Sequence, residues 1–182
     1  MAEYRRVIEI SLLPAEAESD RAVVDTIVDV VNRAYTTAEA GLWRRPLPRT
    51  DNDEVRDQIA NGAVVAARLD GAIVGSLFVR LLDPETGWFG AMGVDPAYGG
   101  QGIGGRLVEF AERQARSAGA STMQLELLVP AQSNAHTDRL AAWYGGLGYR
   151  EVDSRDLAAF DPASVADALV EIRVSVMRKQ LV

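Results

Sequence analysis

The chain has 182 residues, of which 48% are hydrophobic and 25% are charged, with a formal net charge of -7 and a sequence pI near 4.8. This size and composition fit one compact domain over residues 1–182. The acidic balance argues against nucleic acid as the main partner, because phosphate binding needs a basic face. The absence of cysteine and the single histidine, His136, exclude disulfides, thiolate chemistry and a multi-histidine metal centre, so no metal is expected.

The opening of the chain does not have the pattern of a targeting segment. Arg5 and Arg6 precede an apolar run, but Glu9 interrupts that run. No uninterrupted apolar stretch approaches membrane-spanning length. We therefore expect a cytoplasmic protein without a membrane partner.

The first third of the chain predicts a strand and two helices. Apolar residues recur at helical spacing after Asp20, and either Asp20 or Ser19 can supply the N-cap. Gly41 and two prolines mark an exposed loop between the helices. The predicted elements are a strand at 3–13, a helix at 20–35, a loop at 38–53 and a helix at about 53–61.

The middle of the chain predicts an antiparallel meander followed by a helix. Asp70-Gly71 is a strong two-residue hairpin signal between two apolar runs, and the segment at 83–87 turns the chain again. A glycine-rich run then opens a helix that Gly119 ends as its C′ residue. The predicted elements are strands at 63–68, 72–82 and 88–94, and a helix at 103–118.

The last third predicts three strands and a short helix. A strand at 121–129 should lie parallel to the strand at 88–94, because a helix intervenes. A helix at 137–144 and strands within 149–157 and 168–179 follow, and the final two strands should form an antiparallel pair at the far side of the sheet. The fold class is therefore α/β (α+β): one mixed, mostly antiparallel sheet with helices on its faces.

Five glycines stand within seven positions, from Gly99 to Gly105, at the junction of a strand and a helix. A helix N-terminus offers several N–H donors and a favourable dipole to a phosphate, and glycines let the loop turn and admit the ligand without Cβ clashes. The alternative is a turn that merely packs tightly on the sheet. No Lys-Ser or Lys-Thr follows, so this is not a Walker-type loop.

A dinucleotide fingerprint is a second interpretation of the same run. "GQGIGG" satisfies G-x-G-x-x-G, and Glu126 lies 21 residues after Gly105, near the expected ribose-binding acid. In that fingerprint, however, the first glycine follows the strand directly, whereas here "DPAYG" intervenes after Val94. Glu126 also falls inside a predicted strand, and the upstream meander does not fit a Rossmann domain.

The segment from Val94 to Leu107 instead resembles the acetyl-CoA loop of the GNAT superfamily of acyl-CoA-dependent N-acyltransferases. Its pattern is V-x-P-x-x-x-G-x-G-I-G-x-x-L, and "LAAWYGGLGYREV" downstream is similar to the family's second signature, an aromatic-Tyr pair before Leu-Gly-aromatic. Two signatures about 40 residues apart and in the right order are more specific than either alone. The element order agrees over nearly the whole chain.

The resemblance implies acetyl-CoA as cosubstrate and a set of cofactor-binding residues. It places the pantetheine arm along the fourth strand as an added strand, held by the backbone of Met92 and Val94, and so predicts a gap between this strand and the next. The residues that would bind the diphosphate are Gly99, Gly100, Gln101, Gly102, Ile103, Gly104, Gly105 and Arg106. Gly99 stands where the family usually has Arg or Gln, so binding would depend on backbone N–H groups and on Arg106.

Acetyl transfer to an amine needs a base, because an alkylammonium has a pKa near 10 and only about one molecule in a thousand is neutral at pH 7. The strand that usually carries the family's acid has none here. Glu126 on the neighbouring strand is the best substitute, or it is a solvated strand residue; Glu39 and His136 are weaker candidates.

The leaving thiolate needs a proton donor, and Tyr144 matches the family's general acid. Its alternative role is that of a core aromatic like its neighbours Trp143 and Tyr149. Tyrosine has a pKa of about 10 and a thiol about 8.5, so Tyr144 would stabilise the thiolate by hydrogen bonding as much as protonate it.

The acceptor is expected to be an amine-bearing small molecule or peptide, which Tyr35, Glu39 and Trp43 would help to bind from the loop region at 39–49. The predicted function is N-acetyl transfer to a primary amine. The resemblance also allows a homodimer. Two alternatives stay open from the sequence: a non-catalytic acyl-CoA sensor or partner-binding domain, and a nucleotide-dependent oxidoreductase that uses G-x-G-x-x-G.

Overall fold

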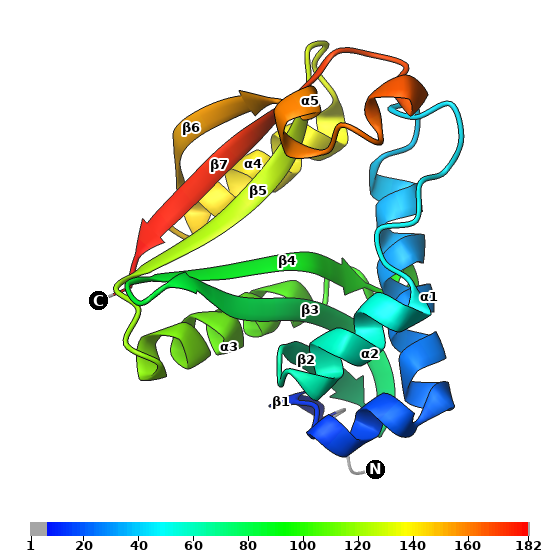
Figure 1. Ribbon diagram of the computed structural model, residues 1–182, viewed down its shortest axis with the longest axis vertical. Coiled ribbons are helices and arrows are strands. Elements are labelled where there is room, and N and C mark those ends of the chain that lie inside the picture. The colour runs from blue at the N-terminus through cyan, green and yellow to red at the C-terminus, as the bar shows by residue number, and fades with distance from the viewer. Residues whose placement is uncertain (1–6, 182) are drawn as a thin grey trace, which may run out of the picture.

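The computed structural model describes residues 7–181, and a single seven-stranded sheet runs through them (Figure 1). The strand order in the sheet is β1-β2-β3-β4-β5-β7-β6, and every neighbouring pair is antiparallel except β4 and β5. The strands are β1 (Ile8–Leu12), β2 (Val64–Leu69), β3 (Ala72–Asp83), β4 (Thr86–Val94), β5 (Thr122–Pro130), β6 (Arg150–Asp156) and β7 (Ile172–Gln180).

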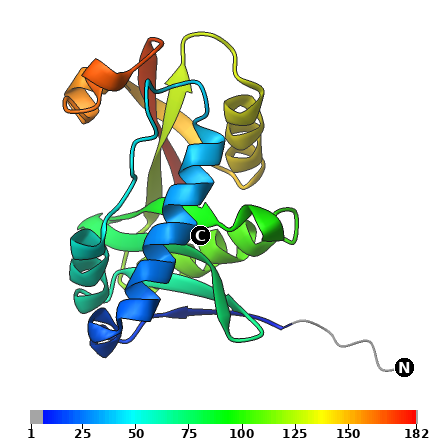
Figure 2. The ribbon, with the colours of Figure 1, turned by 90° about the vertical axis from the view of Figure 1, so that its right-hand side faces the viewer.

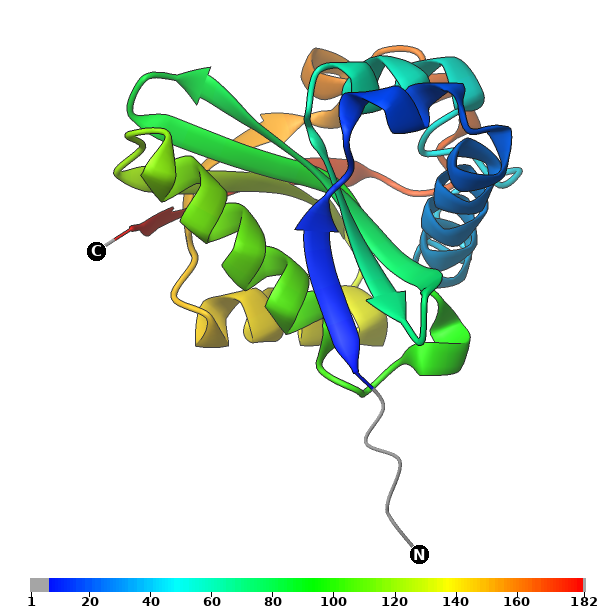
Figure 3. The same ribbon diagram turned by 90° about the horizontal axis from the view of Figure 1, so that it is seen from below.

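Helices cover both faces of the sheet (Figures 2 and 3). The α-helices are α1 (Arg21–Ala38), α2 (Asn52–Ala60), α3 (Ile103–Ser117), α4 (Ala135–Gly146) and the short α5 (Leu157–Phe160). Three 3₁₀ turns, η1 (Ala15–Ser19), η2 (Pro96–Tyr98) and η3 (Val165–Asp167), lie in the connections. Helices α1 and α2 lie on one face, and α3 and α4 lie on the other.

Each face of the sheet has its own apolar core. The core under α1 and α2 contains fully buried Ile27 and Ile59, and the core under α3 and α4 contains fully buried Leu107 and Tyr149. Burying each such side chain contributes about 1.5–3 kcal/mol, so these two layers hold the helices on the sheet. A third, smaller core joins the loop after α1 to β7 and includes Leu42 and Leu157.

The predicted order of the main elements is confirmed, and so is the fold class. Asp20 caps α1 by accepting hydrogen bonds from the N–H groups of Ala22 and Val23, and Gly119 has the positive φ of a C′ residue. The final two strands do form an antiparallel pair at the far side of the sheet. The described part of the first predicted strand is shorter than expected; residues 3–6 of that prediction lie outside the described residues.

The sequence analysis missed α5 and the 3₁₀ turns, and it placed the start of α4 two residues late. The helix begins at Ala135 because the side chain of Asn134 accepts hydrogen bonds from the N–H groups of His136 and Thr137, at 2.9 and 3.3 Å. The sequence signal for the start of α4 was therefore the N-cap residue Asn134, and not the spacing of apolar residues.

Strands β4 and β5 separate after a short parallel stretch. Their pairing covers only Thr86 to Trp88 on β4, whereas β5 continues to pair with β7 up to Pro130. Figure 1 shows the two strands diverging from this junction. The predicted gap between the strands is thus present, and the β5 side of β4 has no strand partner beyond Trp88.

A bulge in β4 lies at this divergence. The register with β3 shifts between Gly90 and Gly93, and Ala91 has a φ of 46°. A Cβ on Gly93 would lie 2.8 Å from the Cα of Val31 in α1, so this glycine allows α1 to approach the sheet. The close neighbour of Gly93 is therefore a helix of the same chain.

Candidate active site

The loop before α3 presents a row of backbone N–H groups without acceptors. Within residues 7–181, none of the N–H groups of residues 100–105 donates to another group of the chain, and the first intrahelical bond runs from Arg106 to Gly102. No side chain caps α3. Several amide donors and the positive end of a 15-residue helix thus converge at one place, which suits a diphosphate.

Two of the five loop glycines are required by their backbone conformation. Gly100 and Gly102 have φ values of 75° and 76°, which L-residues rarely adopt. Gly104 and Gly105 lie in the first turn of α3, where the chain itself leaves room for a Cβ, and Gly99 has an ordinary extended φ. Gly100 and Gly102 thus let the loop turn, whereas Gly104 and Gly105 leave a bare helix surface.

The other three residues of this loop that were predicted to bind the cofactor differ in burial. Ile103 is buried in the core under α3 and anchors the helix, so it offers only its backbone to a ligand. Gln101 and Arg106 are exposed at the start of the helix. Arg106 is therefore positioned to add a positive charge beside the free N–H groups.

Met92 and Val94 lie on β4 beyond the point where β5 turns away. Their side chains are partly buried against the core under α3. The unpaired flank of β4 here is an open strand edge, on which an extended amide-bearing ligand can add as a strand would. The fit to acetyl-CoA therefore rests on two features of this chain, an unpaired strand edge and a row of free amides.

Tyr144 of α4 is a buried aromatic whose hydroxyl retains accessible surface. The side chain is 5% exposed and packs against Phe89, Trp143 and Tyr149, with ring centroids 6.1, 4.8 and 5.9 Å away. Within the described residues its hydroxyl has no hydrogen-bond partner, yet the oxygen is not among the fully buried atoms that lack one. The hydroxyl is thus free to meet a ligand.

Burial raises the pKa of the Tyr144 phenol, and the proximity of Tyr35 adds to this shift. Tyr35 belongs to α1, which lies on the opposite face of the sheet from α4. A raised pKa keeps the phenol protonated. Tyr144 is then a hydrogen-bond donor throughout the neutral range.

Tyr149 forms the wall behind Tyr144. Its hydroxyl donates to Glu112 Oε1 at 2.8 Å, and Lys179 Nζ donates to both oxygens of the same carboxylate. Burial, followed by the nearby Glu112 carboxylate, raises the pKa of Tyr149. This network fixes Tyr149 as a structural residue, which separates its role from that of its unbonded neighbour.

Glu126 lies on β5 just beyond the paired stretch, with a half-buried side chain. Its Oε2 accepts a hydrogen bond from Trp88 Nε1 at 2.5 Å, and its Oε1 accepts one from Gln124 Nε2 at 2.7 Å. Two donors on a carboxylate leave lone pairs on both oxygens for a water or an amine. Glu126 is therefore held in one orientation and is not simply a solvated strand residue.

Gly90 allows this arrangement. A Cβ on Gly90 would lie 2.3 Å from Cζ2 of Trp88, so the indole ring lies directly over the bare backbone. The guanidinium of Arg80 covers the ring at 4.7 Å from its centroid. Gly90 thus makes room for the indole of Trp88.

Tyr35, Glu39 and Trp43 form one cluster, as the sequence analysis grouped them. Trp43 Nε1 donates to Glu39 Oε2 at 2.7 Å, and Arg49 Nη2 pairs with Glu39 Oε1 at 2.5 Å. The Arg49 guanidinium lies 4.4 Å from the centroid of the Tyr35 ring. Burial raises the pKa of Tyr35, Arg49 opposes that shift, Glu39 adds to it, and a backbone hydrogen bond from Met92 opposes it.

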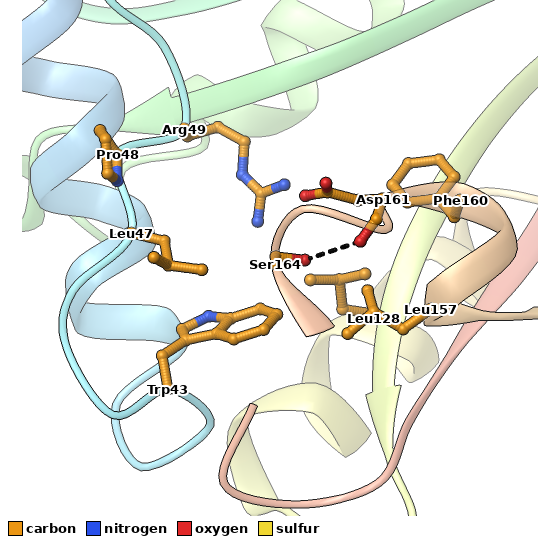
Figure 4. Close-up of a pocket in the computed structure, with 9 residues that line it drawn as sticks. All are labelled: Trp43, Leu47, Pro48, Arg49, Leu128, Leu157, Phe160, Asp161 and Ser164. Carbon is orange, nitrogen blue, oxygen red and sulfur yellow. Dashed lines mark hydrogen bonds between the residues drawn. The ribbon is translucent and has the colours of Figure 1, made fainter. Parts of the chain in front are cut away.

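A pocket opens beside this cluster, between the loop after α1 and the segment that follows β6 (Figure 4). Its lining residues come from three parts of the chain: Trp43, Leu47, Pro48, Arg49, Leu128, Leu157, Phe160, Asp161 and Ser164. The sequence analysis missed the contribution of residues 157–164, which it left between two strands. The small core that joins Leu42 to Leu157 brings this segment to the site, and backbone hydrogen bonds from Arg44 to Asp167 and from Leu169 to Leu42 reinforce the connection.

His136, the weaker candidate for a base, lies in the first turn of α4, where its backbone N–H donates a hydrogen bond to the side-chain oxygen of Asn134.

Among residues 7–181 no group of three or more side chains is placed to hold a metal ion, and no helix has the length and apolar character needed to cross a bilayer.

The G-x-G-x-x-G match does not form a dinucleotide site. The turn η2 separates the end of β4 from the glycines, and Glu126 lies inside β5 with both oxygens bonded to neighbouring side chains. The sheet is also mostly antiparallel, unlike that of a Rossmann domain.

The sequence profile of the acetyltransferase (GNAT) family matches residues 26–142. A search of curated proteins found no match. Several solved structures share the fold. The ribosomal-protein-S18-alanine N-acetyltransferase from Escherichia coli is 18% identical, with a TM-score of 0.68 over 96% of this chain and 94% of that one.

Two further structures are similar over their whole length. The putative acetyltransferase yncA from Salmonella typhimurium, solved with acetyl-CoA, is 17% identical, with a TM-score of 0.64 over 97% of this chain and 95% of that one. An aminoglycoside 6'-N-acetyltransferase complexed with coenzyme A is 17% identical, with a TM-score of 0.69 over 96% and 97% of the two chains. The family match covers well over half of this chain. The chain therefore belongs to the acetyltransferase (GNAT) family, and it is an N-acetyltransferase that takes its acetyl group from acetyl-CoA.

Proposed function

We propose that the chain, as one domain over residues 1–182, acetylates the amine of a small molecule or a peptide in the gap between β4 and β5. The observation that carries this proposal is the unpaired edge of β4 beyond Trp88, together with the row of free N–H groups that opens α3. The G-x-G-x-x-G match forms no dinucleotide site for an oxidoreductase, and a sensor would bind coenzyme A without turnover. A cytoplasmic location and a homodimer stay predictions.

The binding of acetyl-CoA is assigned to two parts of the chain. The free N–H groups of residues 100–105, together with Arg106, would hold the diphosphate. The unpaired flank of β4 at Met92 and Val94 would hold the pantetheine arm by backbone hydrogen bonds. The bound acetyl-CoA supplies an activated acetyl thioester, whose thiolate is the leaving group.

Glu126 is assigned the removal of a proton from the acceptor ammonium, directly or through a water. An amine with a pKa near 10 is neutral in about one molecule in a thousand at pH 7, a handicap of about 4 kcal/mol. A carboxylate oriented by Trp88 and Gln124 beside the gap can relieve that handicap. The same two hydrogen bonds hold the carboxylate in this orientation.

Tyr144 is assigned the stabilisation of the leaving thiolate. Burial raises the pKa of its phenol, so the hydroxyl donates a hydrogen bond without ionising. Full proton transfer from such a phenol to a thiolate is uphill, so the proton on the released thiol comes from the acceptor nitrogen and not from Tyr144. Tyr35, Glu39 and Trp43 are assigned the binding of the acceptor, beside the pocket of Figure 4.

A panel of amines with detection of the released thiol tests this function. The panel should span α-amino acids, alkylamines, polyamines, aminoglycosides and peptides with free N-termini, each with acetyl-CoA. We expect amine-dependent thiol release for at least one class, with an acetylated product of the expected mass. Binding of coenzyme A without thiol release across the panel would instead support a sensor.

A further inference from the structure

The pocket beside the proposed reaction site has apolar walls and two charged groups. Its empty space is about 320 Å³, part of it open to solvent. Apolar side chains make up most of the lining, and Figure 4 shows them grouped around Arg49 and Asp161: Trp43, Leu47, Pro48, Leu128, Leu157 and Phe160. Together with the polar side chains of Arg49, Asp161 and Ser164, such a lining suits a ligand that carries both polar groups and an apolar group of modest size.

Arg49 is fixed in this pocket rather than free to move away from it. The side-chain oxygen of Asn32 in α1 accepts hydrogen bonds from the N–H groups of Arg49 and Thr50, at 2.7 and 3.2 Å, and its amide donates to the Thr50 carbonyl at 2.9 Å. The guanidinium rests on the Tyr35 ring and pairs with Glu39. The position of this cation is therefore preorganised.

One buried donor of this guanidinium has no partner. Arg49 Nε is buried, and within residues 7–181 no acceptor lies in hydrogen-bonding range of it. Buried guanidinium N–H groups are normally satisfied, because leaving one unpaired costs the desolvation of a charged donor. Nη1 of the same group also has no partner among the described residues, and the end of the guanidinium points into the pocket (Figure 4). A ligand oxygen can meet the guanidinium there, and a carboxylate is the strongest acceptor for it.

Asp161 supplies the opposite charge across the pocket. Its carboxylate points toward the Arg49 side chain (Figure 4), yet the two do not form an ion pair. The backbone carbonyl of Asp161 accepts a hydrogen bond from Ser164 Oγ at 3.1 Å, which holds the turn. Arg49 would repel a purely cationic ligand, and Asp161 and Glu39 would repel a purely anionic ligand. A zwitterion matches both walls.

Arg49 is also close to the proposed reaction site. Its guanidinium lies over the ring of Tyr35, and the backbone of Met92 on β4 interacts with the hydroxyl of the same tyrosine. A carboxylate bound at Arg49 would thus leave an amine on the neighbouring carbon near the strand that is assigned the thioester. The side chain of the ligand would then enter the apolar part of the pocket.

We propose that the acceptor is a free amino acid with an apolar side chain, bound by its carboxylate at Arg49. This inference rests on the proposed function. In the reaction, the bond between the amine nitrogen and the acetyl carbon forms and the carbon–sulfur bond breaks. The ammonium loses two protons in all: one protonates the thiolate and the other passes to solvent by way of Glu126, giving an N-acetyl amino acid and coenzyme A.

Calorimetric titration of the full chain in the presence of saturating coenzyme A tests this assignment without requiring turnover. Three probes share one skeleton: leucine, 3-methylbutylamine, which lacks the carboxylate, and 4-methylpentanoate, which lacks the amine. We expect leucine to bind at least about tenfold more tightly than either analogue, because each analogue lacks the group that would pair with one of the two charged side chains of the pocket.

The substitution Arg49→Gln should weaken leucine binding by about ten- to hundredfold and leave 3-methylbutylamine within about threefold. Arg44→Gln is the matched control, since Arg44 is an exposed arginine of the same loop that does not line the pocket. It should change neither affinity. Asp161→Asn should weaken leucine and 3-methylbutylamine but not 4-methylpentanoate.

Equal binding of leucine and 3-methylbutylamine, absence of binding by all three probes, or an equal loss of both by Arg49→Gln would overturn the inference. The first two outcomes concern only the unsubstituted protein, so they do not depend on the folding of a variant. Thiol release with other amines would then leave the proposed function standing. Conversely, selective leucine binding without thiol release for any amine would refute the proposed function and leave the ligand assignment intact.

Discussion

Tyr144 is the residue whose substitution tests the proposed chemistry most clearly. Because its hydroxyl has no partner in the described chain, Tyr144→Phe removes no internal hydrogen bond and should leave folding stability almost unchanged. We expect the turnover number to fall roughly a hundredfold or more, with little change in the KM for acetyl-CoA. Steady-state kinetics with thiol detection measures this, and a turnover number within threefold of the unsubstituted enzyme would remove Tyr144 from the mechanism.

Glu126 can be tested through its dependence on pH. Glu126→Gln should lower kcat/KM about a hundredfold at pH 7, where the acceptor must lose a proton, and the loss should shrink as the pH approaches the acceptor's pKa. Trp88→Phe, which removes only the orienting donor, should give a smaller loss with the same pH trend. A loss that is constant from pH 7 to pH 10 would show that Glu126 does not act as a base.

The residues that the sequence identified are those with a local signal. The positive φ of Gly102 and the cap by Asp20 follow from sequence neighbours, and so does the aromatic-Tyr pair that contains Tyr144. Arg49 and Asp161 could not be assigned in this way, because they are 112 positions apart and meet only through the packing of two loops. Nor does the sequence indicate that the indole of Trp88 lies over Gly90.

The loop that leads into α3 is the element on which cosubstrate binding depends. Gly102→Ala forces an alanine into the left-handed region at a cost of roughly 1–2 kcal/mol, and it should both destabilise the protein and weaken coenzyme A binding. Gly105→Ala is the matched contrast, because its position is helical and the chain leaves room for the methyl group. It should raise the free energy of unfolding by about 0.5–1 kcal/mol.

Gly105→Ala nonetheless should weaken coenzyme A binding roughly tenfold, because the added methyl group occupies space that the diphosphate would use. Urea unfolding and calorimetric titration of both variants separate the two effects. An unchanged affinity for coenzyme A in Gly105→Ala, despite the higher stability, would show that the diphosphate does not approach this turn.

The sequence predicted the types and the order of the helices and strands well, but it predicted their arrangement in space poorly. The hairpin at Asp70-Gly71 and the helix ended by Gly119 are set by local conformational preferences. The divergence of β4 from β5 was expected only from the family resemblance. The divergence depends on which strand pairs with the far half of β5, and β7, which takes that place, lies about 50 residues later in the chain.

For the whole molecule, the buried tyrosines predict a loss of stability at alkaline pH. Tyr144 and Tyr149 are 5% and 0% exposed, and burial raises the pKa of both above the unfolded value near 10. Above pH 10 the unfolded chain therefore loses phenolic protons that the folded chain retains, which favours unfolding. The free energy of unfolding should fall by up to about 2.7 kcal/mol per pH unit from these two groups.

Urea unfolding between pH 8 and pH 11.5 measures this decline, and tyrosinate absorbance should show that the two phenols ionise only when the chain unfolds. The chain contains a single lysine, Lys179, and five tyrosines, so tyrosines dominate the titration of the chain in this range. A stability that stays constant up to pH 11.5 would mean that these tyrosines are not buried as described.

The central claim is that acetyl-CoA lies in the gap between β4 and β5, with its diphosphate on the free amides before α3. A crystal structure of the full chain with coenzyme A tests it most directly. The account predicts diphosphate oxygens within about 3 Å of N–H groups of residues 100–105 and the sulfur facing the Tyr144 hydroxyl. A diphosphate bound elsewhere, or a sulfur on the far side of β5 from Tyr144, would contradict it.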